Sequence, residues 1–163
     1  MEILDSGVAI ITLNRPAALN ALNAEMLSAL NELTSTLEQD QGIRALVMTG
    51  AGTRAFSAGA DINEIVGRAS DDAAPNLGRW TALSWRLANL RMPTIGAING
   101  LCYGGSATLA SALDVRIGCE HSRFRFIAAH YGRINASWTL PVVVGWARAK
   151  DLLYTACVVE PEE

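Results

Sequence analysis

Two short glycine-bearing segments, residues 55–61 and 99–106, contain the groups best suited to chemistry in this sequence. Each segment is predicted to form the abrupt turn between a buried strand and a helix. Small residues there let a ligand approach the backbone, and the first N–H groups of the helix have no partner within it. Two such turns can direct a pair of main-chain N–H groups at one oxygen atom, as a developing thioester enolate requires. The sequence therefore predicts an oxyanion site made largely of main chain.

Strand-like apolar runs alternate with helical stripes around these turns, which is typical of a mixed α/β domain. The predicted strands cover residues 8–13, 45–49 and 94–98. A first amphipathic helix is predicted to begin after Asn23, a suitable N-cap, and to stop at Gly42. A second is predicted from the apolar stripe between residues 77 and 90. The apolar faces of both helices must pack against a sheet.

The helix predicted from Gly105 to Leu113 is different, because almost every residue in it is small or apolar. We expect it to be buried on all sides. A buried helix directs its free N–H groups and the positive end of its dipole at a fixed point, which here lies at Gly104 and Gly105.

The remaining segments are predicted with less regular structure. Residues 61–66 favour a short helix, and residues 67–78 favour a solvated loop that we expect to be the most mobile internal segment. Residues 144–154 indicate a helix, and residues 160–163 indicate the start of another.

Composition narrows the class of protein. The chain has 163 residues, half of them hydrophobic, with a net charge of -3, so residues 1–163 are expected to form a single domain. The weak acidity and the lack of basic runs argue against a nucleic-acid partner. Neither a signal peptide nor a membrane-crossing stretch is evident, which predicts a cytoplasmic protein without a membrane partner. Cys102, Cys119 and Cys157 lack metal-site spacing, so we expect buried thiols and no bound metal.

The order of several motifs resembles one known family. These motifs are Asn14-Arg15-Pro16, Asn20-Ala21-Leu22, Ala58-Gly59-Ala60-Asp61-Ile62, Pro93, Asn99-Gly100 and Gly104-Gly105. Together they resemble the crotonase superfamily, also called the enoyl-CoA hydratase/isomerase family, from about Val8 to the end of the chain. The resemblance implies an α/β fold built as a spiral of strand-strand-helix units.

The resemblance also implies a ligand and roles for particular residues. The substrate would be an acyl-CoA thioester whose oxygen is held by the N–H groups of Ala60 and Gly105, with coenzyme A entering as part of the substrate and no permanently bound cofactor. The carbonyl of Ala58 would meet the adenine amino group. Gly59, Ala60 and Ile62 would line the coenzyme A site, and Arg15 would favour its phosphates.

The family implies an assembly as well. Its members carry a C-terminal helical segment that covers the acyl pocket and builds trimers, and this segment is absent from the sequence. Apolar surface is then expected to be exposed, which favours self-association as a trimer or a dimer of trimers.

Two positions depart from the hydratases of the family. Thr108 and Ala128 stand where the hydratases have glutamates. Hydration of an enoyl thioester needs a base for water and an acid for the α-carbon. A threonine hydroxyl is too weak an acid for either task, and alanine provides neither group. The sequence therefore argues against ordinary hydratase activity.

Another titratable group has to replace the glutamates if the chain is an enzyme. A strand around Ala128 would place His130 on the same side, whereas a helix would place Tyr131 or Gly132 there. His130 and Tyr131 are thus tentative acid/base candidates, although His130 is also consistent with a purely structural role. The alternative function is noncatalytic binding of acyl-CoA. A nucleotide-binding domain is disfavoured, since neither GxGxxG nor a P-loop follows a strand.

The other polar and aromatic residues near the motifs are predicted to serve the fold. We expect a helix-capping carboxylate at Asp61, a solvated side chain at Glu64 and a structural hydrogen bond at Asp114. Ser106 and Thr108 are expected to bond back to their own helix. The aromatic residues Trp80 and Trp85 are expected to be packing residues.

Overall fold

The computed structural model describes residues 1–65 and 74–163. Within this part of the chain, the strands form a five-stranded sheet in the order β1-β2-β3-β5-β7 and a four-stranded sheet in the order β4-β6-β8-β9. The larger sheet contains β1 (Glu2–Ile3), β2 (Val8–Leu13), β3 (Ala45–Gly50), β5 (Thr94–Ile98) and β7 (Val115–Gly118). The smaller contains β4 (Ala55–Ser57), β6 (Leu101–Tyr103), β8 (Arg123–Arg125) and β9 (Val158–Val159).

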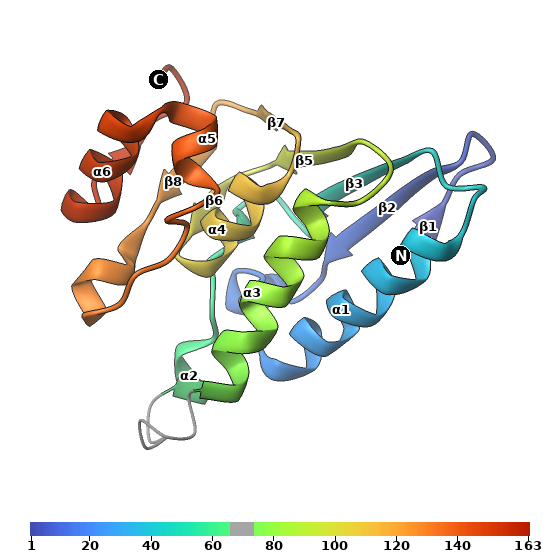
Figure 1. Ribbon diagram of the computed structural model, residues 1–163, viewed down its shortest axis with the longest axis horizontal. Helices are drawn as coiled ribbons and strands as arrows, with labels where there is room; N and C mark the ends of the chain where they lie inside the picture. The colour runs from blue at the N-terminus through green and yellow to red at the C-terminus, as the bar shows by residue number, and fades with distance from the viewer. Residues whose placement is uncertain (66–73) are drawn as a thin grey trace.

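The helices pack on and between these sheets. They are η1 (Pro16–Ala18), α1 (Ala24–Gln39), α2 (Ile62–Ile65), α3 (Ala74–Ala88), α4 (Gly105–Ala112), η3 (Ile127–Tyr131), α5 (Leu140–Val144) and α6 (Trp146–Thr155). Helices α1 and α3 lie side by side in front of the larger sheet, and α4 contacts both α3 and β6 (Figure 1). Among the helices of the described residues, none combines the length and apolar composition that a bilayer crossing requires.

The chain repeats one supersecondary unit. In the pairs β3 then β4, β5 then β6, and β7 then β8, the first strand joins the larger sheet and the second joins the smaller. Within each sheet these strands pair in parallel with the corresponding strand of the neighbouring unit. A helix follows each of the first two pairs, so the predicted spiral of strand-strand-helix units is confirmed.

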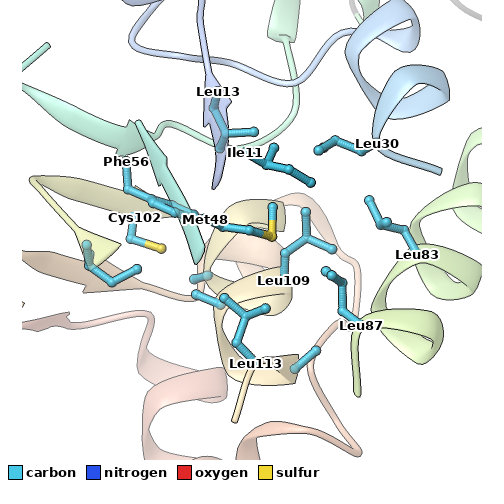
Figure 2. Packing of buried hydrophobic residues seen from close by; sticks show 14 of the residues in the cluster. Ile11, Leu13, Leu30, Met48, Phe56, Leu83, Leu87, Cys102, Leu109 and Leu113 are labelled. Carbon is cyan, nitrogen blue, oxygen red and sulfur yellow. The ribbon is translucent and has the colours of Figure 1, made fainter. Parts of the chain in front are cut away.

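The core lies where the two sheets meet the helices. Asn23 caps α1 through its Oδ1, which accepts a hydrogen bond from Met26 N at 3.0 Å, as predicted. Figure 2 shows side chains from β2, β3, β4, α1, α3 and α4 packed together: Ile11, Leu13, Met48, Phe56, Leu30, Leu83, Leu87 and Leu109. Full burial of one such side chain contributes about 1.5–3 kcal/mol. Helix α4 is buried on nearly all sides, which confirms the prediction from its composition.

Several predictions about local structure were wrong. Of the predicted loop at residues 67–78, residues 67–73 lie outside the described residues, but residues 74–78 already belong to α3. Pro75 is compatible with a helix there because the first turn needs no N–H from it. The helix predicted at residues 144–154 is confirmed as α6 except at its start, where Gly145, with a φ of 77°, separates α6 from α5. The further helix predicted at residues 160–163 is a turn.

The cysteines and one tryptophan also differ from expectation. Cys102 is fully buried, and desolvation raises the pKa of its thiol to about 12. Cys119, however, is exposed in the turn that follows β7, and Cys157 is half-buried. Trp85 is 62% exposed and contacts Trp138, with 5.6 Å between the ring centroids, instead of packing in the core.

Candidate functional site

The two predicted turns lie at the same edge of the smaller sheet. Strands β4 and β6 pair in parallel, so the turns that follow them leave the sheet side by side. The buried hydroxyl of Ser106 ties the turns together, because Oγ lies 2.6 Å from the carbonyl oxygen of Ser57 and 2.8 Å from that of Tyr103. The serine thus bonds back to Tyr103, just before α4 and not within the helix as predicted, and also across to the other turn.

Gly59 brings the two turns into direct contact. Its φ is 92°, and a Cβ at this position would lie 2.5 Å from the carbonyl oxygen of Tyr103 and 3.1 Å from the nitrogen of Gly105. Real side chains do not tolerate the first of these distances, so only glycine fits. The backbone of the first turn therefore packs directly on the start of α4.

The amide of Ala60 is turned away from its neighbouring strand-like segment. Leu22 pairs with Ala60 in an isolated parallel bridge, in which Leu22 N donates to Gly59 O at 2.7 Å and Asp61 N donates to Leu22 O at 3.1 Å. This pattern uses the groups on either side of Ala60 and leaves its own N–H on the opposite edge. Across the described residues, Ala60 N is the donor of none of the backbone hydrogen bonds outside regular elements.

The amide of Gly105 also has no acceptor among the described residues, for a different reason. Gly105 is the first residue of α4, and the N-cap residue Gly104, at φ 57° and ψ -121°, supplies no side-chain cap. The first N–H groups of a helix have no intrahelical acceptor, and in the described part of the chain Gly105 N likewise donates none of those bonds. Within the part of the chain that the structure describes, two main-chain donors are thus uncommitted, and they lie on two backbone segments in contact.

Trp80 of α3 covers this part of α4. A Cβ on Gly105 would lie 2.5 Å from Trp80 Cη2 and 2.7 Å from Cζ3, so the indole ring packs directly on the glycine. Trp80 is partly buried against the core, which confirms its predicted packing role. Its contact with the site was missed, because the helical stripe identifies a buried face without naming what it touches.

Arg15 and Asp61 form an ion pair beside Ala60. Arg15 Nη1 lies 2.8 Å from Asp61 Oδ2 and also donates to Ala21 O at 2.7 Å. The side chain of Asp61 is only 9% exposed. The hydrogen bond from Arg15 lowers the pKa of Asp61 below its ordinary value, against the opposing effect of desolvation. Asp61 Oδ1 accepts from Asn63 N at 3.1 Å, so the predicted capping of α2 is confirmed.

The segment that contains Ala128 borders the second turn. A Cβ on Gly104 would lie 3.3 Å from Cγ1 of Ile127, the residue before Ala128. The hydroxyl of Thr108 lies 3.4 Å from Gly104 O, consistent with the expected bond back to its own helix. Ala128 belongs to the 3₁₀ helix η3, in which residues three apart share a face. Tyr131 therefore shares the face of Ala128.

The structure brings together only some of the predicted site residues. Ala58, Gly59, Ala60 and Gly105 lie on the two contacting turns, with Arg15 attached through Asp61. Ile62 is 59% exposed at the start of α2, and Tyr131 is 64% exposed on η3. His130 is also exposed there.

Two carboxylates singled out in the sequence serve the fold. The prediction of a solvated Glu64 was wrong, since this half-buried side chain accepts from Ala24 N, the first amide of α1, at 2.9 Å. Asp114 makes the predicted structural hydrogen bonds, from Thr94 N at 2.8 Å and Thr94 Oγ1 at 2.9 Å. Elsewhere in the described chain, no three side chains of His, Cys, Asp or Glu converge as metal ligands.

Comparison with known protein families shows which family this chain belongs to. A family model described as enoyl-CoA hydratase/isomerase matches residues 4–163. The chain belongs to this family. Among solved structures, the enoyl-CoA hydratase from Bacillus anthracis superposes with a TM-score of 0.94 at 29% identity, covering 99% of this chain and 64% of that one. The enoyl-CoA hydratase/isomerase fold predicted from the motifs is thus confirmed.

Curated relatives in the enoyl-CoA hydratase/isomerase family include different activities. The chain is 40% identical over 159 residues to the 1,2-epoxyphenylacetyl-CoA isomerase of Escherichia coli K12, covering 91% of this chain and 59% of the relative. It is 34% identical over 165 residues to the short-chain-enoyl-CoA hydratase of Clostridium acetobutylicum, covering 96% and 61%. The chain thus spans about three-fifths of the length of these relatives.

Proposed function

We propose that this chain binds an acyl-CoA thioester and holds the thioester oxygen between the N–H groups of Ala60 and Gly105. The observation that carries this proposal is the pair of uncommitted main-chain donors on two backbone segments in contact through Gly59. Membership of the enoyl-CoA hydratase/isomerase family supports the choice of ligand. Donors placed in this way stabilise a developing enolate, and each is typically worth about 2.7–4 kcal/mol.

The coenzyme A moiety would be held by the first turn and its surroundings. Gly59 N donates to Ser57 Oγ at 3.1 Å, which fixes the Ala58–Gly59 peptide whose carbonyl we assign to the adenine amino group. Gly59 and the exposed side chain of Ile62 would border the same ligand. The side chain of Arg15 is 34% exposed, and its Nε and Nη2 are not used by the bonds to Ala21 and Asp61, so they remain for a phosphate.

As an enzyme, the chain would act through the enolate in a lyase or isomerase reaction. A base removes the proton from the α-carbon, the electron pair moves onto the thioester oxygen, and an acid returns a proton. We propose Tyr131 or His130 for this proton transfer. The 3₁₀ conformation of η3 favours Tyr131, because Tyr131 shares a face with Ala128.

Noncatalytic binding of acyl-CoA is the second candidate function. Thr108 and Ala128 provide no carboxylate, and both proton-transfer candidates are exposed to solvent. These observations favour a protein that keeps the thioester-binding main chain without the acid and base. Both candidate functions predict the same binding site for acyl-CoA, and they differ only in whether the bound thioester is converted to product.

Three measurements on the same preparation distinguish these functions. Calorimetry with butyryl-CoA tests binding, NMR in D₂O follows exchange of its α-protons, and a spectrophotometric assay follows hydration of crotonyl-CoA. Binding with α-proton exchange supports an enzyme, and Tyr131→Phe and His130→Ala then identify the group responsible. Binding without exchange supports the second function. A chain that binds none of these thioesters contradicts both.

We also propose that the chain self-associates as a trimer or a dimer of trimers. The region from η3 to α6 exposes several large apolar side chains: Ile134 at 86%, Val142 at 85%, Trp146 at 68% and Tyr154 at 74%. Apolar surface of this kind marks an interaction site. Sedimentation equilibrium that yields the monomer mass at all concentrations would contradict self-association.

A further inference from the structure

We propose that Arg15 and Asp61 act as a positioning pair that fixes the Ala60 amide for the thioester oxygen, an inference that rests on the proposed function. Asp61 directly follows Ala60, and its Oδ2 accepts from Arg15 Nη1 at 2.8 Å. The same nitrogen donates to Ala21 O at 2.7 Å. One guanidinium nitrogen therefore links the residue before Leu22 to the residue after Ala60.

This contact lies beside the β-bridge between Leu22 and Ala60 and joins its two segments. The bridge has only two backbone hydrogen bonds, at 2.7 Å and 3.1 Å, and is isolated from both sheets. Among the residues that the structure describes, no regular strand on either side of this two-bond bridge helps to fix the peptide that carries the Ala60 N–H. The ion pair adds a third attachment at Asp61, the next residue along the chain, and so restricts the direction of the Ala60 N–H.

Arg15 is itself held in a rigid platform. Arg15 N donates to Asn20 Oδ1 at 3.0 Å, and Asn20 N donates to Arg15 O at 2.9 Å. The side-chain amide of the buried Asn20 donates to Ala55 O at 2.8 Å and to Ala51 O at 3.0 Å. Leu19 and Asn20 both have positive φ, at 50° and 55°, a conformation that persists only where the surroundings over-determine it. The guanidinium thus starts from a fixed backbone.

The pair also balances charge beside the oxyanion. Asp61 is nearly buried and adjacent to one of the two donors, so its carboxylate would oppose a negative charge that develops at the Ala60 amide. The guanidinium neutralises that carboxylate. Loss of Arg15 is therefore expected to weaken the binding of the enolate more than that of the neutral thioester, a distinction that loss of folding alone would not produce.

The first test uses a substrate without phosphates. With an acyl-pantetheine thioester, Arg15→Gln is expected to lower the kcat of α-proton exchange by about 10- to 100-fold, with KM changed by less than about threefold. Arg15→Lys should recover most of the rate, and adding Asp61→Asn to Arg15→Gln should restore part of it by removing the unpaired charge. Arg54→Gln, which removes an exposed charge on the preceding loop, is the control and should change kcat by less than about twofold. A defect seen with acyl-CoA but absent with acyl-pantetheine would assign Arg15 to phosphate binding alone and overturn the pair.

The second test does not depend on turnover. Amide hydrogen exchange of Leu22 and of residue 61, the two donors of the bridge, should accelerate at least about tenfold in folded Arg15→Gln and Asp61→Asn proteins relative to wild type and to Arg54→Gln, as measured by ¹⁵N NMR. Unchanged exchange at both amides would overturn the positioning pair whatever the chain's activity. If exchange is faster in the variants but the wild-type protein binds no thioester, the pair still restrains the local backbone. That result would contradict the proposed function, and with it the role of the pair toward the thioester oxygen.

Discussion

The paired turns at Ala60 and Gly105 and the neighbouring segment around Ala128 differ in how tightly the structure holds them. In the turns, the hydroxyl of Ser106 and the backbone contact at Gly59 fix the segments against each other. Residues 128–134 of the other segment are exposed or half-buried, and Asn135 Oδ1 is buried without a partner among the described residues. The part of the site made of main chain is rigid, whereas the part that would require side chains is loosely built.

The difference between the two regions indicates which parts of such a site are sensitive to amino-acid substitution. A backbone N–H is present in every residue except proline, so the proposed oxyanion site would constrain only the space around the two N–H groups. That constraint falls on Gly59, Gly104 and Gly105, where a Cβ would meet neighbouring atoms. General acid/base catalysis depends on particular side chains, and Thr108 and Ala128 provide no carboxylate at the two positions that resemble those of the hydratase glutamates.

The largest expected effect distinguishes two glycines with positive φ, one in each region. Gly59→Ala introduces left-handed strain of about 1–2 kcal/mol and overpacking of about 1–3 kcal/mol, because its Cβ would meet Tyr103 O. Gly132→Ala, at φ 63° with no atom within 4 Å of its Cβ, introduces the strain alone. Urea denaturation should show a larger loss of unfolding free energy for Gly59→Ala. Equal losses would contradict the tight contact between the turns.

A second prediction restores both carboxylates, one on α4 and one in the segment around Ala128. Thr108→Glu combined with Ala128→Glu is expected to increase hydration of crotonyl-CoA by about 100-fold or more, the usual contribution of a positioned acid and base. Ala129→Glu, which adds a carboxylate at the exposed neighbouring position, is the matched control and should give no increase. A double variant that binds crotonyl-CoA normally and gains no hydration would show that the main-chain site is not arranged for this reaction.

The long elements of the fold were predictable, and the three-residue strands were not. Residues 24–39 carry a clear helical period of apolar residues, because the helix buries one face over several turns, and residues 8–13 form an almost continuous apolar run that is typical of a buried strand. Strands β4, β6 and β8 are too short to show a period, and they exist because distant strands pair with them. The predicted turns therefore contained strands at 55–57 and 101–103 that the sequence did not reveal.

The candidate site divides in the same way. The glycines and small residues at Ala58–Ala60 and Gly104–Gly105 were informative, because a close approach of backbones leaves room for little else. The ion pair of Arg15 with Asp61 joins residues that are 46 positions apart, and nothing local in either motif signals it. The conformation of η3 was also open, since its few residues favour neither period.

A third prediction compares one side chain from each region. Ser106→Ala removes the hydroxyl that bonds the carbonyls of Ser57 and Tyr103, which is expected to cost about 1–3 kcal/mol of unfolding free energy. His130→Ala removes an exposed side chain and should change this free energy by less than about 0.5 kcal/mol. Chemical denaturation of both variants tests the difference. A comparable loss for His130→Ala would mean that η3 is as tightly held as the turns.

The smallest expected effect is a pH dependence of the unfolding free energy that arises from Asp61, beside the first turn. The pKa of Asp61 is lowered in the folded state below the 3.8 of a free aspartate. The carboxylate therefore contributes stability that is fully present above this value and is lost as the pH falls through the lower, folded pKa. The difference in unfolding free energy between wild type and Asp61→Asn should be constant near neutrality and decrease below about pH 4. Because the hydrogen bond from Arg15 is the main cause of the lowered pKa, this acid-dependent difference should largely disappear in an Arg15→Gln background. An undiminished difference in that background would assign the acid dependence to other contacts of Asp61, such as the amide of Asn63.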